Sequence, residues 1–225
     1  MAILCTNGRG DFSVSPKNNQ PKGLIIMTKR EVYNVQPIKD SNVLKQVQDT
    51  LLHHFEAGRR NYTIFQLGKA TLLRASDVLL LKYSDVFTDT GVLKERAYIR
   101  DKKTKKSNVV YLKPLEKDLL IYQEWLKEQS IQSEWLFPST TRTDQHITVK
   151  QYYKIMVKTG DLLGINYLGT HTMRKTGAYR VYVQSKYNIG FVMSLLNHSD
   201  QKSTLSYLGL DVISKEALLD GINFG

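Results

Sequence analysis

Hydrophobic residues recur every three or four positions along most of the chain from residue 40 onward, a spacing typical of amphipathic helices. The first such run predicts a helix over 42–57 with Ser41 as its capping residue. The same spacing, with Ser76 and Pro114 at helix starts and Gly164 at a helix end, predicts more helices further along the chain. Their expected ranges are 61–73, 76–82, 114–129, 148–163, 171–185, 189–196, 201–207 and 214–220.

Two short segments have the character of β-strands instead. Residues 96–100 and 108–112 are rich in Tyr, Ile and Val, and they flank the basic turn 101–107. This arrangement predicts an antiparallel hairpin. The expected fold class is therefore mainly α with a small antiparallel β-sheet (α+β).

The first 36 residues differ from the rest of the chain. They contain many Gly, Ser, Asn, Pro and Lys residues and show no apolar period, so burial cannot offset the entropy lost on ordering them. We expect residues 1–36 to form a flexible, disordered tail and 37–225 to form the folded domain. Met27 lies within this tail and is a candidate start of a shorter product.

Charge narrows the choice of partner. Among the 225 residues, 32 are Lys or Arg and 21 are Asp or Glu, which leaves a net charge of +11. This excess predicts a polyanion, with nucleic acid as the first choice and an acidic membrane surface as the second. A single cysteine excludes an intrachain disulfide and a cysteine-built zinc site. No apolar run reaches the length of a membrane span. We expect a soluble cytoplasmic protein without a metal or other cofactor.

Four short signatures follow one another along the regular part of the chain. The first contains Arg74 and Asp77, and the second is Lys103 in the basic turn. The third is the His-x-x-Arg pattern of His171 and Arg174. The fourth joins His198 to Tyr207 nine residues later. Each pattern alone is common, whereas their joint order is specific.

In this order the signatures resemble those of the tyrosine recombinase (phage integrase) family, and the resemblance runs from about residue 40 to the C-terminus. It implies the fold of a tyrosine recombinase catalytic domain. Two positions depart from the usual pattern: Lys175 stands where the family often has His, and Asn197 replaces the commoner Gly before His198. A separate N-terminal core-binding domain, usual in the family, is not evident before Arg74.

The resemblance implies a role for each residue. Arg74 and Arg174 clamp the non-bridging oxygens of a DNA phosphate, a task that suits the planar, permanently charged guanidinium. His198 adds a third donor, and His171 accepts or relays the tyrosine proton. Tyr207 is the nucleophile that becomes a phosphotyrosine.

The remaining roles fall on a supporting carboxylate and on lysines. Lys103 is the general acid for the leaving 5′ oxygen, chosen among its neighbours by counting back from Val109. Asp77, one helical turn from Arg74, is expected to hold that guanidinium through an ion pair. The residues expected to contact DNA are Lys102, Lys105, Lys106 and Lys175.

The implied function is site-specific recombination of double-stranded DNA through a 3′-phosphotyrosine intermediate, in the integration or excision of a mobile element. The implied partners are DNA, other protomers in a tetrameric synapse and accessory DNA-bending proteins. In the family a terminal helix docks on a neighbouring protomer, and the apolar segment after Tyr207 is a candidate for it. Two alternatives remain at this point: a non-catalytic DNA-binding remnant or accessory protein of an integrase, and an activity like that of type IB topoisomerases.

Overall fold

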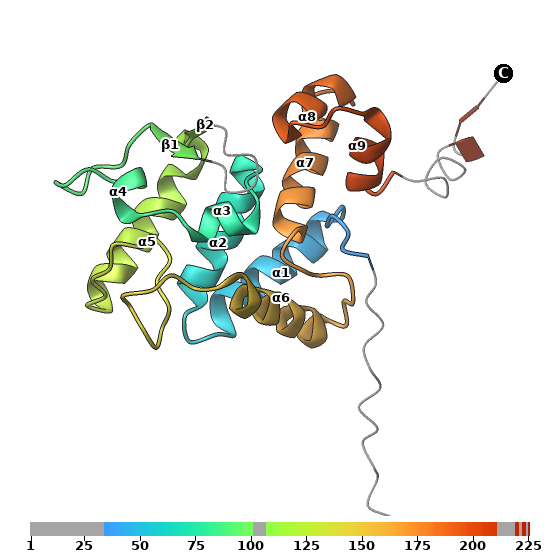
Figure 1. Cartoon of the computed structure of the whole chain (residues 1–225). Coiled ribbons are helices and arrows are strands. Elements are labelled where there is room, and N and C mark those ends of the chain that lie inside the picture. Colours follow the sequence, from blue (N-terminus) through green and yellow to red (C-terminus); the bar gives the residue numbers. More distant parts are fainter. Residues whose placement is uncertain (1–33, 101–106, 211–218, 221, 224) are drawn as a thin grey trace, which may run out of the picture. The chain divides into compact units, whose positions relative to one another are not determined.

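A computed structural model describes residues 34–100, 107–210, 219–220, 222–223 and 225. Within the described residues the fold is mostly helical, with one two-stranded antiparallel sheet (Figure 1). The elements in chain order are α1 (Ser41–His53), α2 (Gly58–Thr71), α3 (Ala75–Leu79), α4 (Tyr83–Val86), β1 (Arg96–Arg100), β2 (Ser107–Tyr111), the 3₁₀ turn η1 (Lys113–Leu115), α5 (Glu116–Glu128), α6 (Val149–Leu163), α7 (Thr172–Gln184), α8 (Ile189–Leu196) and α9 (Gln201–Tyr207).

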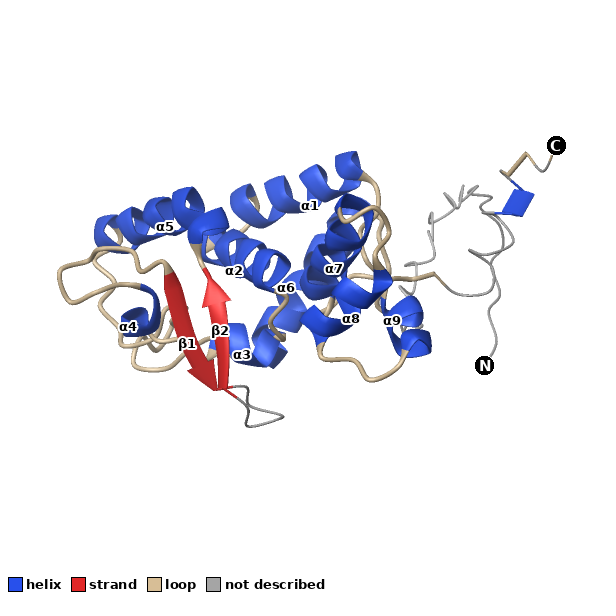
Figure 2. Cartoon of the chain, turned by 90° about the horizontal axis from the view of Figure 1, so that it is seen from above, coloured by secondary structure: helices blue, strands red, loops and turns tan. Residues whose placement is uncertain are grey.

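The predicted hairpin and the predicted fold class are confirmed. In the sheet Arg96 pairs with Tyr111 and Arg100 pairs with Ser107. The end of the sheet where β1 finishes and β2 begins lies beside α3 (Figure 2). Asp77 of α3 and Arg100 of β1 also line one cavity of about 200 Å³. The strand ends that lead into the basic turn therefore lie near the segment that carries Arg74.

Helix limits differ from the sequence prediction: α1 ends at His53 and not at 57, α3 ends at Leu79 and not at 82, and α4 was not predicted. The cap of α1 is Asp40 and not Ser41, because the Asp40 carboxylate accepts hydrogen bonds from the backbone N–H groups of Asn42 and Val43. Carboxylate and hydroxyl side chains both cap helices, so spacing alone does not choose between adjacent candidates. Ser76 lies inside α3, whose N-cap position is taken by Arg74.

The prediction of a helix over 148–163 that ends at Gly164 is confirmed within one residue. The Thr148 hydroxyl accepts a hydrogen bond from the backbone N–H of Gln151, and the Gln151 side chain accepts one from the N–H of Thr148 in return. At the other end Gly164 has φ of +68°, the left-handed conformation that glycine adopts without steric cost. The expected helix 214–220 lies largely outside the described residues.

The described chain starts before the expected domain boundary at residue 37. Residues 34–39, here called the N-terminal strap, lie against the segments around α7 and α9. The backbone N–H of Gln36 donates to the carbonyl of Tyr167, and that of Ile38 donates to the Thr176 hydroxyl. The Lys39 ammonium donates to the carbonyl of Gly209 at 2.7 Å. The expected tail 1–36 otherwise lies outside the described residues.

Two hydrophobic clusters organise the described residues. The larger gathers buried side chains from α1 to α7 and includes Phe65, Leu79 and Tyr152. The smaller joins Leu72, at the end of α2, to apolar side chains of α7, α8 and the segment after α9. α2 and α7 thus contribute to both clusters, and their mutual packing connects the two parts of the core (Figure 2).

The α2–α7 contact requires a glycine. A Cβ atom added at Gly177 of α7 would lie 1.9 Å from the carbonyl oxygen of Lys69 in α2, a distance at which backbone must move. We predict that Gly177→Ala lowers the free energy of unfolding by about 1–3 kcal/mol, because a helix backbone cannot rotate away as a side chain can. Urea unfolding followed by circular dichroism measures this loss.

Gly190→Ala in α8 is the matched control. A Cβ atom there would meet only the Asn188 side chain at 3.5 Å, an ordinary contact. Helix propensity should make this variant more stable by up to about 1 kcal/mol. Equal effects of the two alanines on the unfolding midpoint would show that the close approach at Gly177 is not a constraint.

Candidate active site

Arg74 lies in the sharp turn between α2 and α3. Leu72, the residue that ends α2, has φ of +55°, a left-handed conformation that costs a non-glycine residue about 1–2 kcal/mol. The Leu72 side chain is buried in the smaller cluster, and this burial offsets the backbone cost. The turn leaves Arg74 in extended conformation at the start of α3, with its side chain half-buried.

The third signature forms the start of α7. His171 occupies the N-cap position and is exposed, and Arg174 follows one helical turn later and is only 6% exposed. The Arg174 guanidinium donates to the carbonyl of Leu196 at 3.2 Å. This bond attaches α7 to the end of α8 just before His198.

Asn197 explains how one departure from the family pattern is tolerated. It ends α8 with φ of +55° and ψ of 44°, a left-handed conformation. Asparagine is among the few residues other than glycine that adopt this conformation readily. The backbone N–H of His198 then donates to the carbonyl of Met193 and closes the turn. Asn197 therefore performs the backbone role of the commoner glycine.

Tyr207 is the last residue of α9 and lies beside His198. The two rings meet edge to face, with centroids 5.3 Å apart and planes at 84°. Burial raises the pKa of the Tyr207 phenol, while the nearby guanidinium groups of Arg174 and Arg74 act in the opposite direction. The Tyr207 hydroxyl oxygen is enclosed and makes no hydrogen bond of good geometry with the described residues. The phenol thus keeps its proton in the free protein and stands next to two positive charges.

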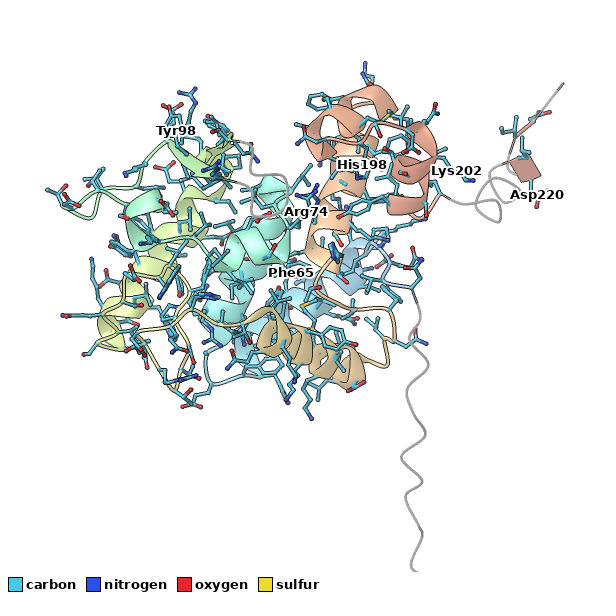
Figure 3. All side chains as sticks on the ribbon, in the orientation of Figure 1. Phe65, Arg74, Tyr98, His198, Lys202 and Asp220 are labelled. Carbon is cyan, nitrogen blue, oxygen red and sulfur yellow. The ribbon has the colours of Figure 1, made fainter. Side chains whose placement is uncertain are left out.

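The two arginines also act on each other and on His198. Burial lowers the pKa of Arg174 first, and Arg74 lowers it further. Burial also lowers the pKa of His198, as do Arg174 and Arg74, while Asp200 opposes them. Figure 3 shows Arg74 and His198 near each other, where α3 faces the α7–α9 segment. Two guanidinium groups, an imidazole and a phenol from four chain segments therefore converge on one place.

Asp77 is buried in α3, and its backbone N–H donates to the carbonyl of Arg74. Its charge raises the pKa of Arg174, so the carboxylate lies close to the second arginine. An ion pair between Asp77 and Arg74 remains a prediction. The buried carboxylate thus supplies a negative charge that stabilises the charged form of Arg174.

The lysines expected at DNA divide into two groups. Lys102, Lys103, Lys105 and Lys106 lie outside the described residues. Lys175 has an internal place instead of the expected surface place, because it is only 8% exposed and its ammonium donates to the carbonyl of Val35 at 2.7 Å. The same ammonium lies 5.2 Å from the centroid of the Tyr207 ring, a cation–π contact. We therefore interpret Lys175 as a support for Tyr207 and for the N-terminal strap.

One residue of this site was not expected from the sequence. The Thr204 side chain is fully buried, and its hydroxyl oxygen lies 3.0 Å from Nδ1 of His198. The sequence feature that could have indicated Thr204 is its position one helical turn before Tyr207, since this spacing places both residues on one face of α9. Ser203 and Ser206 are similar residues in the same helix, so spacing did not single out Thr204.

Two other kinds of feature are absent from the described residues. No group of three or more His, Cys, Asp or Glu side chains in this part of the chain is arranged to hold a metal ion. No helix in it is long and apolar enough to cross a membrane.

Comparison with known proteins identifies the family of the chain. The Phage integrase family matches residues 27–212 of the chain. A curated relative, the probable integrase/recombinase YoeC of Bacillus subtilis (strain 168), is 33% identical over 178 residues, which make up 79% of this chain and 91% of YoeC. The chain belongs to the phage integrase family, also called the tyrosine recombinases.

Solved structures show the same fold. XerH recombinase, in a post-cleavage complex with palindromic difH substrate, superposes with a TM-score of 0.61 at 19% identity, over 85% of this chain and 54% of XerH. A lambda integrase tetramer bound to a Holliday junction gives a TM-score of 0.57 at 14% identity, over 78% of this chain and 48% of that protein. The chain thus spans about half the length of these two recombinases, and its fold is that of their catalytic domains.

The electrostatics of the site can be tested at His198. We predict that Arg74→Gln raises the pKa of His198 toward the ordinary histidine value of about 6.5, because one of the positive charges that disfavour the imidazolium is removed. NMR titration of the histidine ring resonances measures the change. Arg142→Gln is the control, since Arg142 is exposed and the charges that act on His198 are those of Arg174, Asp200 and Arg74. If the pKa of His198 is the same in Arg74→Gln as in the unaltered protein, Arg74 does not act on His198 and is not part of this site.

Proposed function

We propose that this protein is a site-specific DNA recombinase that cleaves and rejoins strands through a 3′-phosphotyrosine intermediate. The observation that carries the proposal is the meeting of Tyr207 with Arg74, Arg174 and His198. A phenol beside two cations and an imidazole is suited to attack a phosphodiester, since the same positive charges bind the phosphate and stabilise the charge that develops on it.

We propose the following course for the reaction. The Tyr207 oxygen attacks the phosphorus and its proton passes to a base, for which His171 is our candidate. Arg74 and Arg174 bind the non-bridging oxygens. The bond from phosphorus to the 5′ oxygen breaks, and Lys103 supplies the proton to that oxygen. Attack by the 5′ hydroxyl of another strand reverses these steps and releases Tyr207, so that the bond energy is kept without a nucleotide cofactor.

The raised pKa of Tyr207 has a functional meaning in this scheme. A buried phenol keeps its proton until the base and the phosphate are both present, so that the nucleophile is not active in the free protein. The two arginines oppose the effect of burial and reduce the cost of forming the phenolate during attack. Activation of Tyr207 would therefore depend on the arrival of DNA.

The proposal includes assembly on DNA. The solved relatives include a lambda integrase dimer bound to a core site and a tetramer bound to a Holliday junction. We propose that this chain also pairs two DNA sites with several protomers, that it serves the integration or excision of a mobile element, and that DNA-bending proteins assist it. Supporting this, its net charge of +11 suits a protein that lies against a polyanion.

The nucleophile is the sharpest test. We predict that Tyr207→Phe abolishes the covalent protein–DNA adduct while DNA binding is kept, because only the attacking oxygen is removed. The measurement uses nicked duplexes that cover the DNA on either side of the gene, with the adduct detected by its resistance to SDS. Tyr187→Phe is the matched control, since Tyr187 is an exposed tyrosine that lies outside the site.

The outcomes separate the candidate functions. Adduct that persists in Tyr207→Phe would move the nucleophile to another tyrosine. DNA binding without adduct in the unaltered protein would indicate a non-catalytic remnant. Adduct formation with relaxation of supercoiled DNA, but without exchange between two sites, would indicate an activity like that of type IB topoisomerases.

Salt dependence tests the DNA partner independently of catalysis. If binding neutralises about six phosphates, the slope of log K against log salt concentration should be roughly −5. Fluorescence anisotropy with a labelled duplex at several salt concentrations measures this slope. A slope near zero would mean that the excess positive charge does not face DNA.

A further inference from the structure

Thr204 holds two polar neighbours at hydrogen-bond distance inside the protein. Its hydroxyl oxygen lies 3.2 Å from the carbonyl oxygen of Asp200 and 3.0 Å from Nδ1 of His198. The Thr204 side chain is 0% exposed, so water cannot take the place of either neighbour. Every hydrogen in this group must therefore be supplied by the three residues themselves.

The distribution of hydrogens then follows from what each atom can do. The Asp200 carbonyl oxygen can only accept, and Thr204 has one hydroxyl hydrogen to donate to it. The Thr204 oxygen is left as an acceptor for the second contact, and His198 must donate to it from Nδ1–H. The opposite assignment would place the Thr204 and Asp200 oxygens 3.2 Å apart with no hydrogen between them.

The charges around His198 favour the same tautomer. Arg174 and Arg74 act on the imidazole from α7 and from the start of α3, while Asp200 acts from the cap of α9. Tyr207 faces the ring from the end of α9, with Lys175 of α7 over the face of Tyr207. A lone pair on Nε2 is favourable next to the two guanidinium groups, whereas an N–H dipole directed at them is not.

We propose that Thr204 is a positioning residue that holds neutral His198 as the Nδ1–H tautomer, so that Nε2 can donate a hydrogen bond to a phosphate only after it gains a proton. The role of the phosphate here rests on the proposed recombinase function. The proton comes from solvent as the phosphate binds, and the resulting imidazolium donates from Nδ1 to Thr204 and from Nε2 to a phosphate oxygen. His198 thereby couples anion binding to the uptake of one proton.

The tautomer can be tested in the free full-length protein. We expect the ¹⁵N chemical shifts of the His198 ring at a pH above its titration to show hydrogen on Nδ1 in the unaltered protein and in Thr204→Ser, which keeps the hydroxyl. In Thr204→Val, which keeps the shape and removes the hydroxyl, Nδ1–H loses its acceptor, so the fraction of ring hydrogen on Nε2 should rise, although Arg174 and Arg74 still favour hydrogen on Nδ1. Hydrogen on Nε2 in the unaltered protein would overturn the proposal, even if the valine variant does not fold.

Proton uptake can be tested with inorganic sulfate, which carries the shape and charge of a phosphate group but does not titrate near neutral pH. Sulfate affinity of the unaltered protein and of Thr204→Ser should weaken with rising pH, by up to about tenfold per pH unit when one proton is taken up. In Thr204→Val part of the neutral ring can donate from Nε2, so this pH dependence should be shallower than in the unaltered protein and in Thr204→Ser. Equal pH dependence in all three proteins would contradict the role of Thr204.

These results are distinguishable from failure of the proposed function. The tautomer and the sulfate titration are read without DNA cleavage, so they stand whether or not Tyr207 forms an adduct. A protein that forms the adduct but carries hydrogen on Nε2 would keep the recombinase proposal and reject the role of Thr204. A protein with the predicted tautomer but no adduct would keep the role of Thr204 and reject the recombinase proposal.

Discussion

The close approach of α7 to α2 is the constraint on which the site depends. α2 ends at the turn that presents Arg74, and α7 begins with His171 and Arg174, so the spacing of these two helices sets how near the arginines come. Gly177 permits that spacing because there is no room for a Cβ atom against the Lys69 carbonyl. A stability feature in the middle of α7 therefore also determines the geometry of the two guanidinium groups.

The site holds the positive charges of Arg74 and Arg174 close together, which costs electrostatic free energy. Arg74 and Arg174 repel each other, and burial disfavours the charged form of Arg174. The surroundings compensate in part through the buried Asp77 carboxylate and the Leu196 carbonyl. An anion that binds between the arginines would relieve the remaining repulsion, and this relief is a source of binding free energy that is specific for negative charge. The free protein is thus arranged for a ligand that it does not itself supply.

Much of this fold and site was predictable from the sequence. Helices such as α6 carry both a regular apolar spacing and clear end signals in Thr148 and Gly164, so local rules suffice for them. The order of Arg74, His171, Arg174, His198 and Tyr207 indicated the family, and the structure brings Arg74, Arg174, His198 and Tyr207 together.

What residue type and spacing missed depends on contacts and backbone angles of the folded chain. Lys175 looks like a DNA contact until the strap, 140 residues earlier, supplies the Val35 carbonyl that binds it. Thr204 gains its role only once the turn at Asn197 brings His198 back over α9. The choice of Asp40 over Ser41 as a cap depends on backbone angles that residue type does not determine. In each case the residue type was suitable for more than one role, and the folded backbone decided between them.

The N-terminal strap affects the order in which parts of the domain fold. Lys39 bonds to Gly209 across 170 positions, and Lys175 bonds to Val35 across 140. Contacts of such long range form late, since the intervening chain must first lose the entropy of a very large loop. Both bonds flank Tyr207, so this tyrosine, the proposed nucleophile, reaches its place only after nearly the whole domain has been synthesised and folded. A ribosome-bound or truncated chain would then carry the arginines without a positioned tyrosine, and an incomplete product could hold DNA without cutting it.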